Sequence, residues 1–112
     1  MDTQTPTGRD RRSYFRVQYP EEYRPKITIR GIDYTIIDIC EIGIRFHNPM
    51  NNKLPGDIFQ AVVTLHDQDV INIVGRVIRV FDAEAAMMMT IRGIPYRKII
   101  SEQAYLRQVR LS

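Results

Sequence analysis

The chain has 112 residues, 44% of them hydrophobic and 26% charged, which suits one folded domain and excludes a wholly disordered chain. The formal net charge is only +3, yet thirteen of the sixteen basic residues are arginine. The single cysteine, Cys40, excludes an internal disulfide and a four-cysteine metal site. Because no apolar run can span a bilayer and the N-terminus lacks the apolar core of a secretory signal, we expect a cytoplasmic protein.

The chain begins with a polar segment. Residues 1–10 carry Thr, Gln, Pro, Gly and charge without apolar periodicity, so we expect a flexible N-terminal tail followed by one domain over 11–112. The start of this domain, 11–19, forms an arm rich in arginine and aromatic residues. A guanidinium can bind phosphate and stack on a purine, although arginines can also simply cover a surface.

Short β-branched and aromatic runs separated by turn residues follow from Lys26 onward. The runs at 26–30 and 33–40 predict a hairpin, with a tight turn near Gly31 and Ile32. Further strands are expected at 44–47, 57–66, 69–80 and 86–93, with a polar loop at 48–57. Short strands joined by short turns predict an all-β fold, a six-stranded antiparallel β-barrel.

The C-terminal segment changes period and predicts a short amphipathic helix of about two to three turns, packed against the barrel. Ser101 suits its N-cap and Glu102 its positive end, while Arg107 and Arg110 suit its negative end. One apolar stripe contains Tyr105, Leu106 and Val109. We interpret Tyr105 as a packing residue.

Few residues could act in catalysis. Only Cys40, His47 and His66 could form a nucleophile and base pair, and neither histidine has the spacing of paired metal ligands. Both histidines are expected at the surface or in loops. The phosphate-binding patterns GxxxxGK and GxGxxG do not occur. We therefore expect a protein that is not an enzyme.

The arm contains an RxxxR pattern formed by Arg12 and Arg16, with Arg11 beside it. By itself this spacing is weak evidence, because a chain so rich in arginine contains roughly one or two such pairs by chance. An exposed basic arm is the simplest alternative.

A second pattern, DICEIG at 38–43, ends the second predicted strand. Strand alternation places Asp38 and Cys40 on one face, and Gly43 permits a positive φ if the chain reverses tightly before Ile44. A carboxylate at the rim of a barrel can accept the paired N–H donors of a guanine edge. An aspartate that caps its own turn is the alternative.

Together the two patterns resemble the PilZ domain family, which carries RxxxR in an N-terminal arm and D/NxSxxG at a strand end. The remaining sequence is also similar, with IRF after the glycine, KLPGD in a turn, GRVIRV in a long strand and IPYRKIISEQAYLRQ in the tail. The resemblance covers about residues 9–110 and implies a PilZ-type barrel with a C-terminal helix.

The resemblance also implies a site for cyclic di-GMP, with no further cofactor and no metal. Arg12 and Arg16 would bind the phosphates and guanine faces, Asp38 a guanine edge, and Gly43 would keep the turn. Arg11 is a weaker candidate for a phosphate contact. Cys40 stands where the family has serine, and a thiol is a poorer hydrogen-bonding group, which is expected to weaken binding by about 1 kcal/mol.

The expected partners are cyclic di-GMP and an unidentified effector protein, with the arm becoming ordered over the barrel when the ligand binds. A PilZ-like adaptor that recognises a protein without nucleotide is the alternative. Binding of single-stranded nucleic acid is disfavoured, because acidic residues interrupt a continuous basic groove. Membrane insertion is not expected.

Overall fold

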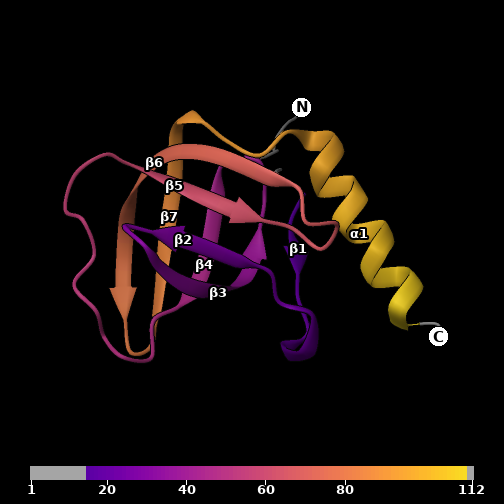
Figure 1. Cartoon of the computed structure of the whole chain (residues 1–112), viewed down its shortest axis with the longest axis horizontal. Helices are drawn as coiled ribbons and strands as arrows, with labels where there is room; N and C mark the ends of the chain where they lie inside the picture. Colours follow the sequence, from indigo (N-terminus) through magenta and orange to yellow (C-terminus); the bar gives the residue numbers. More distant parts are fainter. Residues whose placement is uncertain (1–14, 111–112) are drawn as a thin grey trace, which may run out of the picture.

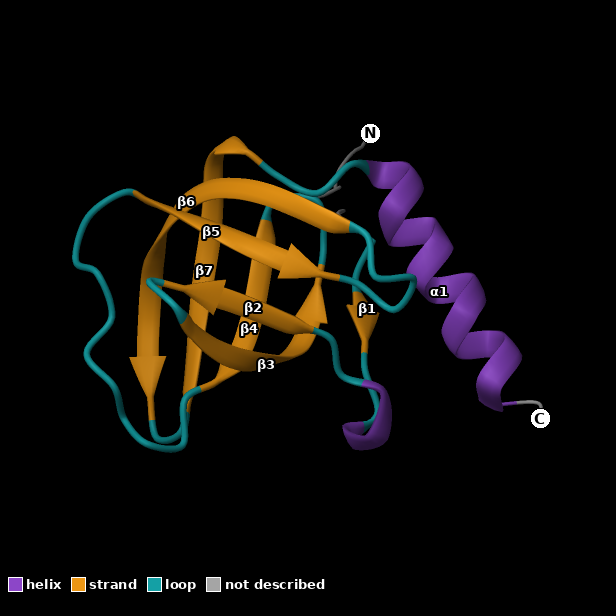
Figure 2. Ribbon diagram, viewed as in Figure 1, coloured by secondary structure: helices purple, strands orange, loops and turns teal. Residues whose placement is uncertain are grey.

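The computed structural model describes residues 15–110. Within this range the strands curve around one core and a long helix lies beside the barrel (Figure 1; Figure 2). The elements are β1 (Val17–Gln18), a 3₁₀ turn η1 (Glu21–Tyr23), β2 (Lys26–Ile29), β3 (Ile32–Ile39), β4 (Gly43–His47), β5 (Phe59–Thr64), β6 (Val70–Phe81), β7 (Glu84–Arg92) and α1 (Tyr96–Arg110).

The strands pair in the order β1-β3-β2-β5-β6-β7-β4, and β4 also pairs with β3. All of these pairings are antiparallel, so six strands close into a barrel and β1 is added outside β3. Closure leaves β3 flanked by β1 and β4 as well as by β2. The predicted six-stranded antiparallel barrel is confirmed.

The core is built by alternation of inward and outward side chains. On β5 the residues Phe59, Ala61 and Val63 are buried while Gln60 is exposed. β7 buries Ala85, Met87 and Met89 in the same way. Each large aliphatic side chain removed from water contributes about 1.5–3 kcal/mol, so this alternation fixes the register of every strand.

Two turns differ from the sequence prediction. The β2–β3 turn is formed by Arg30 and Gly31, whose φ angles of 50° and 81° suit a two-residue turn one position earlier than expected. Before β7 the chain reverses across Asp82, with φ 51°, and Ala83, so that Phe81 pairs with Glu84. A turn this tight explains why β7 begins two residues before the predicted start at 86.

β3 contains a bulge between Ile36 and Asp38. The extra residue lets Ile36 and Ile39 both enter the core although they are three positions apart. Asp38 and Cys40 then share the other face, as alternation predicts, and both line a cavity outside the core. The bulge is therefore what brings a carboxylate to the barrel rim.

α1 begins at Tyr96, so the prediction of an N-cap at Ser101 and of two to three turns is wrong. The carbonyl of Pro95 accepts the first bonds, from the amides of Lys98 and Ile99. Proline tolerates this position because the first helical N–H groups have no intrahelical partner. Ile99 is fully buried, and its packing explains why the helix starts a turn earlier.

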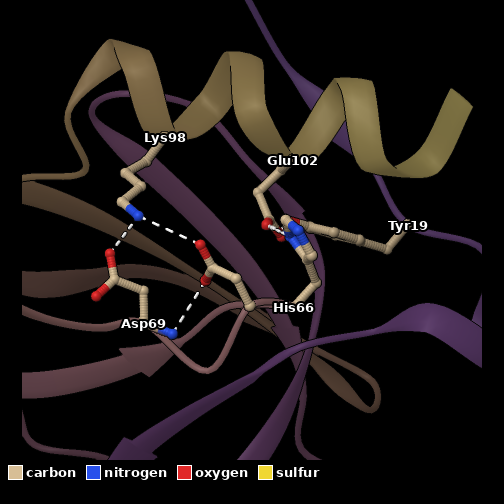
Figure 3. Close-up of polar contacts among 6 residues, drawn as sticks. Tyr19, His66, Asp69, Lys98 and Glu102 are labelled. Carbon is tan, nitrogen blue, oxygen red and sulfur yellow. Dashed lines mark hydrogen bonds and ion pairs between the residues drawn. The ribbon is translucent and has the colours of Figure 1, made fainter. Parts of the chain in front are cut away.

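The predicted apolar stripe of α1 is confirmed, with Leu106 buried and Tyr105 and Val109 packed on the core. The prediction that Glu102 lies at the positive end of the helix is wrong, because the helix begins at Tyr96 and Glu102 lies on the buried stripe. Its carboxylate accepts a hydrogen bond of 2.6 Å from the Tyr19 hydroxyl and contacts Nδ1 of His66 (Figure 3). The His66 ring stacks on Tyr105 at 4.0 Å.

Tyr19, His66, Tyr105 and Glu102, here called the Glu102 cluster, join α1 to β1 and to the loop after β5. Beside it, Lys98 forms an ion pair with Asp69 (Figure 3). A second ion pair joins Lys98 to Asp67 at 3.4 Å. No helix among residues 15–110 has the length and apolarity needed to cross a membrane.

Candidate functional site

The site is centred on Asp38, a carboxylate that is only 2% exposed. β1 pairs with β3 so that Gln18 lies opposite Asp38, and β4 pairs with β3 so that Arg45 lies opposite it. Cationic side chains therefore reach one carboxylate from both sides, from within β4 and from the segment that leads into β1. Arg16 precedes β1 by one residue and reaches Asp38 from there.

Both carboxylate oxygens of Asp38 are bonded to guanidinium groups. Nη1 of Arg16 donates to Oδ1 at 2.5 Å, while Nε and Nη2 of Arg45 lie 3.0 and 2.8 Å from Oδ2. Arg45 also approaches Glu84 at 3.5 Å. An ionised carboxylate has about four acceptor positions, so Asp38 retains capacity for a further donor.

Cys40 and Gly43 complete the wall around Arg16. Nη2 of Arg16 lies 3.7 Å from Sγ of the buried Cys40. A Cβ added at Gly43 would lie 3.5 Å from that sulfur and 3.9 Å from Nη2 of Arg16, which is ordinary contact. Gly43 does not have a positive φ, so the prediction that it serves a tight left-handed reversal is wrong. Gly43 is instead the first residue of β4 and lies beside the guanidinium group of Arg16.

These residues face a cavity of about 680 Å³, called the Asp38 cavity, which is within the range of small-molecule sites. Its polar side chains come from several strands and its apolar side from β6, β7 and the turn before β4. The lining consists of Arg16, Gln18, Asp38, Cys40, Ile42, Gly43, Ile44, Arg45, Ile78, Arg79, Ala86, Met87 and Met88. A cationic and acidic rim thus lies next to an apolar surface.

The predicted residues Arg16, Asp38, Cys40 and Gly43 all line this cavity. Arg11 and Arg12 lie outside the residues that the structure describes, as does the expected tail at 1–10. Of the two arginines in the predicted RxxxR pattern, the structure therefore describes only Arg16.

Sequence reasoning missed Arg45 and Arg79. Arg45 could have been found, because strand alternation from Gly43 places it on the face of that glycine, opposite the apolar side of β4. Arg79 carries no comparable signal, since its place at the cavity depends on the irregular pairing of β6 with β7.

The two histidines lie away from the Asp38 cavity. His66 lies in the turn after β5, in line with the predicted surface or loop position, but its side chain is half-buried in the Glu102 cluster. His47 lies at the end of β4, where its Nδ1 is 3.4 Å from Nη1 of Arg24. Among residues 15–110 no group of three potential metal ligands comes together.

Comparison with known proteins agrees with this architecture. A crystal structure of an uncharacterized protein from Legionella superposes with a TM-score of 0.57 at 15% sequence identity, covering 87% of this chain and 95% of that chain. At this identity the likeness shows the fold alone. No curated protein gives a significant sequence match. The sequence profile of the PilZ domain matches residues 10–108, nearly the whole chain, and the protein therefore belongs to the PilZ domain family.

Proposed function

We propose that the protein binds cyclic di-GMP in the Asp38 cavity and acts as a sensor rather than as an enzyme. The observation that carries the proposal is the convergence of Arg16, Arg45 and Asp38 on one cavity in a PilZ domain. The ligand has two phosphates and two guanines. It needs cations that bind phosphate, a carboxylate that accepts from a guanine edge, and apolar surface for the ring faces.

Each requirement has a candidate in the cavity. With three of its roughly four acceptor positions facing guanidinium nitrogens, Asp38 can accept one further N–H, from a guanine edge. Arg16, with a side chain 45% exposed, can donate to phosphate while it stays paired to Asp38. The apolar side chains of Ile42, Ile78 and Met88 line the same space and offer surface for a purine.

Arg11 and Arg12 are proposed to supply further phosphate contacts from the arm that precedes Phe15. Each guanidinium bonded to phosphate makes charge-assisted hydrogen bonds, which offset the entropy lost when the arm becomes ordered. The ordered arm would then present a new surface to an effector protein.

Isothermal calorimetry with cyclic di-GMP tests the proposal. We expect Arg16→Ala and Asp38→Ala each to weaken binding at least tenfold, because each removes a charge-assisted contact of about 1.5–3 kcal/mol. Arg76→Ala is the matched control, since Arg76 is an exposed arginine on β6 that does not line the cavity. Absence of binding by the unmodified chain would reject the sensor.

A protein adaptor is the second candidate, and one observation favours it. The end of β6 exposes Ile78, Val80 and Phe81 at 50%, 54% and 45%. Neighbouring exposed apolar side chains are typical of protein interaction surfaces. The same calorimetry separates the two functions, because an adaptor of this kind would give no heat with cyclic di-GMP.

A further inference from the structure

A second cavity, of about 580 Å³, lies between the segment around β1 and the C-terminal half of α1. We call it the helix groove. It is lined by Phe15, Arg16, Val17, Gln18, Gln103, Leu106, Arg107 and Arg110. Arg16 and Gln18 also line the Asp38 cavity, so these two side chains separate the two spaces. α1 and β1 lie next to each other along this side of the barrel (Figure 1).

The helix groove is cationic. Gln103, Arg107 and Arg110 are spaced four and three residues apart, which places them along one face of α1. No carboxylate of residues 15–110 lines the groove, and the ion pairs found among those residues do not include Arg107 or Arg110. Glu102, the nearest acid along the helix, is bonded to Tyr19 and His66 instead.

The base of the groove is apolar. Val17 and Leu106 are both 4% exposed and form part of the core, whereas Phe15 is 37% exposed and lies at the groove. An aromatic ring beside guanidinium groups that form no ion pair within residues 15–110 suits a flat base joined to a phosphate. In contrast to the Asp38 cavity, no carboxylate of residues 15–110 is present in the groove to accept from the N–H groups of a guanine edge.

The geometry points to the helix groove as a second nucleotide subsite, in which Arg107 and Arg110 bind a phosphate and Phe15 stacks on a base. Arg16 lines both the groove and the Asp38 cavity, so the subsite would extend the proposed cyclic di-GMP site. The identity of the ligand at Asp38 is taken from the proposed function. The phosphate has two possible sources. It belongs to the cyclic di-GMP held at Asp38, or it belongs to a separate nucleotide.

The alternative role of Arg107 and Arg110 is to stabilise the negative end of the helix dipole. That role predicts a change in helix stability and no change in binding. The test therefore uses the variant R107Q/R110Q, in the full chain, with R97Q as the matched control. Arg97 is exposed in the first turn of the same helix and does not line the groove. Thermal unfolding of both variants checks that they fold.

Two measurements follow on each protein. Calorimetry with cyclic di-GMP at low and high salt tests the first source, because exposed charge contacts weaken as salt rises. Amide chemical shifts of residues 103–110 during titration with 5′-GMP and, separately, 5′-AMP test the second. A loss of about tenfold or more in cyclic di-GMP affinity for R107Q/R110Q, absent in R97Q, supports the subsite with the phosphate of the bound dinucleotide.

Shifts at 103–110 with either mononucleotide, lost in R107Q/R110Q, support the subsite with a separate nucleotide. If those shifts occur while the unmodified chain fails to bind cyclic di-GMP, the proposed function fails and the subsite stands. If cyclic di-GMP binds equally to all three proteins and neither mononucleotide shifts 103–110, the subsite is overturned and the proposed function stands. If neither ligand class binds any of the proteins, both fail.

Discussion

Asp38 is buried and bears a charge that the protein must compensate. Two guanidinium groups do so, but Arg16 and Arg45 are themselves partly exposed, so they retain hydration that a fully buried pair would lose. The cost of removing a partner is therefore asymmetric. Loss of one arginine leaves the buried Asp38 carboxylate with a single guanidinium partner. Loss of Asp38 leaves two guanidinium groups that water can still hydrate.

A double-mutant cycle measures this coupling. We expect Arg45→Ala to lower the free energy of unfolding by about 1–3 kcal/mol, because Asp38 loses a charge-assisted partner. In an Asp38→Asn background the same substitution should cost less by about 1 kcal/mol or more. Urea denaturation of the four proteins gives the coupling energy. Additivity within about 0.5 kcal/mol would show that the pair contributes nothing.

Cys40 offers a test of the thiol at the site. In Cys40→Ser the hydroxyl is a better donor and acceptor beside Arg16, so we expect cyclic di-GMP affinity to rise several-fold, or about 1 kcal/mol. Cys40→Ala, which has no polar group, is the control and should bind no better than the unmodified chain. An equal gain in both variants would assign the effect to side-chain volume instead.

At the scale of the elements, two strands depend on glycine at a point of close approach. β6 pairs irregularly with β7 between Val74 and Gly75, and this irregularity brings Gly75 onto the backbone of β7. A Cβ at Gly75 would overlap the carbonyl oxygen of Met88 and lie 2.8 Å from Cα of Met89. Because the obstacle is backbone, a rotamer change cannot relieve it.

We expect Gly75→Ala to lower the free energy of unfolding by about 2–3 kcal/mol, since the β6–β7 pairing must shift. Gly56→Ala is the matched control, because nothing lies within 4 Å of a Cβ built there. It should leave stability unchanged or raise it slightly through the unfolded chain. Chemical denaturation of both variants makes the comparison, and equal effects would contradict the close approach.

α1 shows what a sequence pattern can and cannot predict. The stripe through Leu106 and Val109 follows from helical periodicity and is correct. The start of the helix at Tyr96 and the burial of Glu102 do not follow, because both depend on what the barrel presents. A serine followed by a glutamate is a common helix start in sequence, but here Tyr19 and His66 turn that glutamate inward.

At the scale of the whole molecule, the short strands and their turns, together with the family resemblance, were enough to predict a six-stranded antiparallel barrel. The site was predictable in part, because Asp38, Cys40 and Gly43 lie within one short motif. Alternation from Gly43 could have placed Arg45 on the same face of β4, but its contact with Asp38 could not be predicted, since that contact arises from the β3–β4 register and its bulge. Residues that meet through register are not marked by their spacing in sequence.

The Glu102 cluster links the stability of the whole fold to pH. Burial, and then the hydrogen bond to Glu102, raises the pKa of the Tyr19 hydroxyl above its ordinary value. In the unfolded chain a tyrosine ionises near pH 10, so the folded chain holds this proton where the unfolded chain has lost it. Stability from this group is therefore complete below about pH 10 and falls as pH rises further.

We expect Tyr19→Phe to reduce the slope of unfolding free energy against pH above about pH 10, by up to roughly 1.4 kcal/mol per pH unit. Urea denaturation between about pH 8 and 11 measures the slope. Tyr96→Phe is the control, because the Tyr96 side chain is exposed. If Tyr19→Phe and the unmodified chain have parallel profiles, Tyr19 does not contribute to the alkaline loss of stability.

Arg16 and Tyr19 belong to the same short segment, yet they bond to carboxylates of different elements, Asp38 on β3 and Glu102 on α1. Three residue steps in an extended chain span no more than about 10 Å, so little slack exists between the two contacts. A movement of this segment that breaks its contact with one carboxylate is therefore expected to disturb its contact with the other. The barrel rim at Asp38 and helix α1 are therefore linked through one short stretch of chain, residues 16–19.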